Sequence, residues 1–285
     1  MTAKTRSTVP RLRPLPPPPA DFDPFTAGAR TFARHGVPPR PDPVKDPGLA
    51  ALWDTTARRF SGYEHLAPEV DATTAGRPPT TLGIGPSEFQ SSGFSLASTG
   101  APFTALFVHW TVPNLVYVPT PSGRNLFHTF VGLGFLDVHV QMSVTSAQKV
   151  TAAVSASAVG DVSLPVAPGD AMSAAICLDP NPPGRANYVI ANETRGQTMN
   201  FSVDTHFPPA VTVDAGVTRD LVDNNPTASP LARFGVVYFD EISAYTTAGP
   251  RSLTGGSAIT MTDLNGSVLA RPVRITDYTF KVLRA

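Results

Sequence analysis

The stretch Phe127–Val144, FHTFVGLGFLDVHVQMSV, decides the fold. In its second half polar residues alternate with apolar ones, and the polar set is Asp137, His139, Gln141 and Ser143. A period of two predicts a half-buried strand with one face in a core. The polar face carries groups that can bind a ligand or transfer protons, although a solvated outer face of a sandwich gives the same pattern.

The strand signal continues on both sides of this stretch. From about Phe89 onward, short runs rich in Val, Ile, Phe, Tyr and Thr are separated by Gly, Pro, Asn and Asp, with no repeat of fixed period. Examples are Val138–Ala147, Ala210–Val213, Phe234–Phe239 and Glu241–Thr246. Many short strands with turn signals between them predict an all-β, two-sheet antiparallel sandwich.

The first part of the chain has a different character. Residues 1–45 are rich in proline, which fixes φ and lacks an amide hydrogen, so we expect an extended arm that joins no regular sheet or helix. Residues 46–87 are expected to form one amphipathic helix and a loop, since Asp46 is a good N-cap and Pro47 suits the first helical position. This helix either packs on the domain or is a removable segment that covers a groove. The sandwich is then expected over residues 88–285.

The composition argues against several classes of function and bears on where in the cell the protein resides. The chain has 22 basic and 22 acidic residues and no basic stripe, which argues against nucleic-acid binding and against binding to an anionic membrane. No apolar run approaches the ~18 residues of a membrane span. The N-terminus lacks the apolar segment of a secretory signal, so we expect a cytoplasmic protein or export by another route. A single cysteine, Cys177, excludes an intrachain disulfide.

The common catalytic and metal-binding motifs are absent. There is no GxSxG, HExxH, GxxxxGK[ST] or CxxC pattern. His109, His128 and His139 fall in or near expected strands, but their spacing matches no known metal motif. We therefore expect no metal and no cofactor.

Six segments, taken in order, resemble the glutamic peptidase family, the eqolisins. The match to the family hairpin xxxNxTTGQxxxxxx is the closest of them. The segments are SSGF (91–94), HWTVP (109–113), FVGLGF with VHVQMSV (130–144), APGD (167–170), VIANETRGQTMNFSV (189–203) and SPLARFGVVYFDEISA (229–244).

The resemblance implies a concanavalin-like jelly roll whose concave face holds an extended substrate. It also implies a catalytic glutamine and glutamate on that face, the glutamate as general base and the glutamine amide as oxyanion donor. Gln141 matches the glutamine. The glutamate lies in a family segment of the form AExxxED, and residues 217–225, VTRDLVDNN, contain no glutamate. Asp223 is the best positional match and Asp220 the next, but a carboxylate set back by ~1.5 Å can cost about a hundredfold in rate.

These departures from the family pattern shape the expected function. We expect an eqolisin-like face that binds an extended polymer, most simply a peptide, with weak or lost acid endopeptidase activity. Substrate contacts are expected from His139, Asp137, Phe130 and Trp110. The alternatives are a lectin-like module for polysaccharide and a non-catalytic assembly protein that self-associates through the N-terminal arm.

Overall fold

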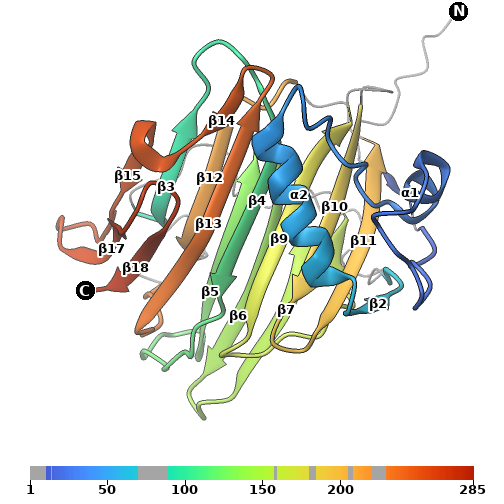
Figure 1. The fold of residues 1–285 in the computed structure, drawn as a ribbon. Coiled ribbons are helices and arrows are strands. Elements are labelled where there is room, and N and C mark those ends of the chain that lie inside the picture. Colours follow the sequence, from blue (N-terminus) through green and yellow to red (C-terminus); the bar gives the residue numbers. More distant parts are fainter. Residues whose placement is uncertain are drawn as a thin grey trace, which may run out of the picture.

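The computed structural model describes residues 11–13, 15–69, 89–156, 159–179, 184–204, 208–219 and 229–285. Two β-sheets pack face to face, and a single long helix lies across the outside of one of them (Figure 1). The predicted all-β, two-sheet sandwich is confirmed. Within the described chain the β2–β11 pair is parallel and the other paired strands are antiparallel.

The larger sheet, sheet A, has eleven strands in the described chain. In spatial order they are β1 (Arg11–Arg13), β11 (Gln197–Asp204), β10 (Arg185–Asn192), β9 (Ala171–Asp179), β4 (Phe103–Thr111), β13 (Val236–Thr246), β18 (Phe280–Arg284), β17 (Val268–Arg274) and β16 (Met261–Thr262), with β2 (Glu64–Leu66) beside β11 and β14 (Gly249–Arg251) beside β13.

The smaller sheet, sheet B, has seven strands in the described chain and contains the strand that opened the sequence argument. In spatial order they are β15 (Ser257–Ile259), β3 (Ser91–Ala97), β12 (Thr212–Thr218), β5 (Arg124–Leu133), β6 (Leu136–Thr145), β7 (Val150–Ala156) and β8 (Gly160–Val162). A 3₁₀ turn, η2 (Leu253–Gly255), precedes β15.

The core lies between the two sheets and follows from the period-two pattern. On β6 the apolar residues Val138, Val140, Met142 and Val144 are fully buried in it. The polar residues between them therefore point away from sheet A. The predicted alternation of this strand is confirmed, and it fixes which face of sheet B carries Gln141.

Helix α2 (Pro47–Phe60) forms as the sequence predicts. The Asp46 side chain accepts a hydrogen bond from the Leu49 amide, and Pro47 occupies the first helical position. The helix packs Phe60 on Phe107, Val189 and Ala191, which lie on the face of sheet A that points away from sheet B. Figure 1 shows α2 in front of β4 and β9, with β5, β6 and β7 in the layer behind. Helix α2 therefore packs on the domain and lies on the opposite side of the sandwich from the Gln141 side chain.

The prediction that residues 1–45 join no regular sheet or helix is wrong. Residues 11–13 form β1, and Ala29–His35 form helix α1. Both elements occupy proline-free pieces of the segment, and β1 pairs at the sheet edge with β11. Proline fixes its own φ and favours an extended residue before it, which a strand accepts, so short elements form between prolines.

None of the helices in the described part of the chain is both long enough and apolar enough to span a bilayer.

Candidate functional site

Strand register places a compact polar group on the outer face of sheet B. His128 of β5 lies opposite Gln141 of β6, and Thr218 of β12 lies opposite His128. In an antiparallel pair, directly opposed residues share a face. The row through Gln141 is thus Ser91, Thr218, His128, Gln141 and Ala153. This row contains no carboxylate.

The next row brings Phe130 and His139 to the same face. Phe130 lies opposite His139 on β6, and Gly216 lies opposite Phe130. One row further on, Asp137 lies opposite Gly132. We call the outer face of sheet B that carries these three rows the Gln141 face. It brings together four of the predicted site residues, namely Gln141, His139, Asp137 and Phe130.

Asp137 and His139 form a hydrogen-bonded pair on the Gln141 face. The Oδ1 atom of Asp137 lies 3.0 Å from Nδ1 of His139, and the two residues are 5% and 8% exposed. An ionised carboxylate can only accept, so Nδ1 carries the proton and Nε2 of a neutral ring presents a lone pair. The His128 ring lies beside it, with ring centroids 5.4 Å apart. Gln141 itself is half-buried, so it is the more accessible part of the group.

The sequence did not lead us to predict a further carboxylate on this face, that of Asp214. The sequence prediction ended the strand at Val213, whereas β12 runs to Thr218. Asp214 is buried, and burial raises the pKa of its carboxyl group, while hydrogen bonds from Ser95 and Thr212 oppose the increase. The alternation of Val213, Ala215 and Val217 with polar or small residues would have revealed it, but Gly216 weakens the strand signal.

One other predicted residue, Trp110, does not join the group, and two lie outside the described residues. Trp110 is 1% exposed in the core, where its indole N–H donates to Thr129, so it does not line the Gln141 face. A tryptophan in an alternating strand points into or out of the core according to register, which the sequence did not determine. Asp220 and Asp223 lie outside the described residues.

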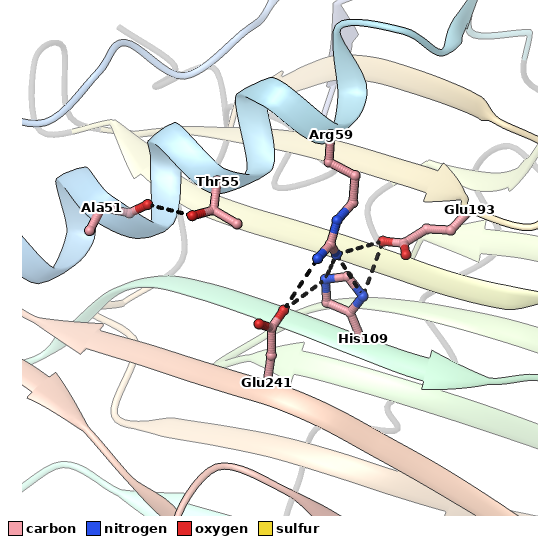
Figure 2. A network of polar contacts seen from close by, with 6 residues as sticks. All are labelled: Ala51, Thr55, Arg59, His109, Glu193 and Glu241. Carbon is pink, nitrogen blue, oxygen red and sulfur yellow. Dashed lines mark hydrogen bonds and ion pairs between the residues drawn. The ribbon is translucent and has the colours of Figure 1, made fainter.

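A second polar cluster lies on the other side of the molecule, between α2 and sheet A (Figure 2). Arg59 of α2 reaches His109 of β4, with its Nη1 atom 2.7 Å from Nε2 and 3.3 Å from Glu193 Oε1. His109 also contacts Glu193 at 3.0 Å and Glu241 at 3.4 Å through its two ring nitrogens. Because the two glutamates approach opposite ring nitrogens, they do not converge on one metal position.

The electrostatics of this cluster favour ionised glutamate. Burial raises the pKa of Glu193, but the contact with His109 and the charge of Arg59 lower it by more, so the pKa lies below its usual value. Glu241 has a φ of 51° at an irregularity in the β4–β13 register, which helps it to reach the cluster. The cluster thus ties α2 to sheet A. Across the described residues no group of three or more His, Cys, Asp or Glu side chains is arranged to hold a metal ion.

Comparison with known proteins identifies the fold and the family. The model of the Peptidase A4 family matches residues 90–282. Scytalido-glutamic peptidase, solved with a transition state analog inhibitor, is similar over 70% of this chain and 99% of its own, with 15% identity and a TM-score of 0.54. SCP-B, an eqolisin peptidase in complex with the tripeptide Ala-Ile-His, is similar over the same shares of the two chains, with 15% identity and a TM-score of 0.52. No curated protein sequence matches. Since the family model spans most of the chain and the sandwich agrees with it, the chain belongs to the Peptidase A4, or eqolisin, family.

Proposed function

We propose that the Gln141 face binds an extended peptide and has weak or lost acid endopeptidase activity. The observation that carries this proposal is the row through Gln141, whose described members include the glutamine amide and no carboxylate. An amide N–H suits a peptide carbonyl or an oxyanion because it donates without proton transfer. Acid hydrolysis of the glutamic type also needs a base within reach of the same water molecule.

The family relationship supports a peptide as the ligand. Scytalido-glutamic peptidase was solved with a peptide-based transition state analog, and SCP-B with a tripeptide. A sheet face with small residues between polar ones suits an extended backbone. Gly132 has no side chain on the Gln141 face, and a Cβ added there would meet its neighbours only at ordinary contact distances.

The described residues do not favour a sugar-binding site. Stacking on a sugar needs an exposed aromatic ring, and Phe130 on this face is 4% exposed while Trp110 is in the core. The N-terminal arm contacts its own chain, since β1 pairs with β11 and the His35 ring of α1 hydrogen-bonds to the carbonyl of Pro16.

The test uses the full chain and a set of fluorescently labelled unfolded peptides between pH 2 and 9. Wild type is compared with Gln141→Ala and Asp223→Ala, and with Gln197→Ala on sheet A as the matched control. Binding that weakens in Gln141→Ala and persists in Gln197→Ala supports the proposal. Rapid cleavage at acid pH by wild type, absent in Asp223→Ala, would contradict weak or lost activity. It would show an active peptidase whose base is an aspartate. No binding at any pH by a folded chain would overturn the proposal.

A further inference from the structure

We propose that His139, held by Asp137, is a general base on the Gln141 face, and that this face hydrolyses peptides at near-neutral pH. The inference rests on the proposed function, because it requires a peptide on the Gln141 face. It differs from glutamic-type chemistry in the group that accepts the proton. A carboxylate base serves acid conditions, whereas an imidazole serves only where it is neutral.

The first support is the hydrogen bond between Asp137 Oδ1 and His139 Nδ1, at 3.0 Å. A carboxylate on one ring nitrogen fixes the tautomer and the orientation of the ring and stabilises the imidazolium that forms when the other nitrogen takes a proton. Asp137 is therefore a positioning residue. The His139 side chain is 11% exposed, so a water molecule can contact the ring while bulk solvent is largely excluded.

The second support is the relation of this pair to Gln141. His139 and Gln141 are two residues apart on β6 and share its outer face, and successive residues of one face are ~6.8 Å apart along a strand. This spacing puts the His139 ring and the Gln141 amide at adjacent positions on one face. The described members of the row through Gln141 include no carboxylate, and we assign the base to the His139 ring in the adjacent row.

Other titratable groups face His139 from the strands around it. His128 contributes from β5 with its ring 5.4 Å away, and Asp161 of β8 lies in the His139 row beyond Ser155 of β7. Asp214 faces the same side from β12.

The reaction conserves atoms and charge. Nε2 of His139 takes a proton from water while the water oxygen bonds to the scissile carbonyl carbon, and the carbonyl oxygen becomes an oxyanion that accepts from the Gln141 amide. When the oxyanion collapses, the C–N bond breaks and the Nε2 proton passes to the leaving nitrogen. One water molecule is consumed, one carboxylic acid and one amine form, and the imidazole is regenerated.

A buried Asp–His pair on one strand can also serve only to pack that strand, so the test needs a readout that a change in packing leaves unaltered. His139→Asn provides one. Its amide nitrogen takes the place of Nδ1 and keeps the bond to Asp137, while the Nε2 base is lost. Asp137→Asn keeps the side-chain volume and removes the charge that fixes the tautomer. The matched controls on the opposite side of the molecule are His65→Asn and Asp54→Asn.

The experiment measures kcat and KM on internally quenched peptides from pH 3 to 9, beside binding of uncleaved peptide and a thermal melt for each variant. We expect wild-type kcat to rise between about pH 5 and 8, the range in which imidazole side chains lose a proton. We expect His139→Asn to lose about 10²- to 10⁴-fold in kcat with KM and binding retained, the range typical of a general base. Asp137→Asn should lower kcat by up to about 10⁴-fold, as is found for the triad aspartate of serine proteases.

Three results would overturn the inference. The first is cleavage with an optimum below about pH 4 that His139→Asn leaves intact. The second is an equal loss of kcat in His139→Asn and His65→Asn. The third is peptide binding by wild type without cleavage at any pH. The last result leaves the proposed peptide-binding function standing. Absence of binding refutes the function itself, so the two failures are distinguishable.

Discussion

The indole nitrogen of Trp110 on β4 donates a hydrogen bond to Thr129 Oγ1 on β5, at 2.9 Å, and this bond joins the two sheets inside the core. Both residues are almost completely buried. A buried donor that loses its partner costs more than the bond itself contributes, because the donor cannot return to water.

This relationship predicts that Thr129→Val lowers the free energy of unfolding by about 1–3 kcal/mol, since the indole N–H remains buried without an acceptor. Thr129→Ser keeps the hydroxyl and is the control, with a smaller loss from the missing methyl group. Urea denaturation followed by Trp fluorescence measures both. Equal losses in the two variants would show that packing, and not the hydrogen bond, matters at this position.

The hairpin between β10 and β11 is held by one carboxylate. Asp170 Oδ2 accepts from Ala167 N, Asn192 Nδ2 and Arg195 Nε at 2.8, 2.7 and 3.0 Å. Burial raises the pKa of Asp170, but these donors lower it by more, so its pKa lies below the usual 3.8. A depressed pKa in the folded state contributes stability above the unfolded pKa, and this stability is lost as pH falls through the folded value.

We therefore predict that Asp170→Asn lowers the free energy of unfolding at pH 7 by about 1–3 kcal/mol. The difference from wild type should shrink as pH falls below about 4, where the carboxylate protonates first in the unfolded chain and then, at its lower pKa, in the folded one. Asp263→Asn, at an exposed turn, is the control and should change stability little at either pH. Thermal melts at pH 7 and pH 3 make the comparison, and a constant difference at both values would contradict the assigned role of the charge.

The cluster in Figure 2 predicts acid-sensitive docking of α2. Because the pKa of Glu193 lies below its usual 4.5, its charge stabilises docking above that pH and this stabilisation is lost as the carboxylate protonates. Arg59→Met keeps the aliphatic stem and should speed amide exchange in α2 by up to about fivefold at pH 7, as a partly exposed ion pair contributes at most ~1 kcal/mol.

Hydrogen exchange of residues 47–60 measures this effect. Arg58→Met is the comparison, because the Arg58 guanidinium lies over the Phe25 ring. If Glu193→Gln and Arg59→Met both leave the exchange of α2 unchanged, the apolar contact of Phe60 alone docks the helix.

The close approach of β3 and β12 depends on two facing glycines. A Cβ at Gly93 would overlap the backbone carbonyl oxygen of Ala215, and one at Gly216 would overlap that of Ser92. Backbone cannot move aside as a side chain does, so Gly93→Ala and Gly216→Ala should each destabilise the protein by ~2 kcal/mol or more. Gly235→Ala, with open space around its Cβ, is the control. Melting temperatures equal to the control would show that the strands can separate without cost.

The sequence predicts those parts of the fold that depend on local pattern. The alternation in β6 and the Asp46–Pro47 start of α2 appear where expected, because each rests on a local rule of strand period or helix capping. Phe234–Phe239 and Glu241–Thr246 merge into the single strand β13, since an irregularity at Glu241 lets the strand continue. Local signals do not reveal such a feature, because it depends on the pairing with β4.

The sequence predicted only those residues of the candidate site that lie on a single strand. Gln141, His139 and Asp137 share β6, so period two alone brings them to one face. His128 and Asp214 reach the same face through the register of β5 and β12, and register is a property of strand pairs. Trp110 was assigned to this face without such information and lies in the core.

The position of α2 has a practical consequence for surface-based assays. Because α2 and the Gln141 face lie on opposite sides of the sandwich, a biotin on the exposed Lys45, next to the start of α2, would anchor the molecule with Gln141 directed toward the solution. Peptides passed over such a sensor would meet the proposed binding face without obstruction by the support. The same protein attached through Ser143 would have that face against the support, so the two orientations form an internal comparison of where ligands dock.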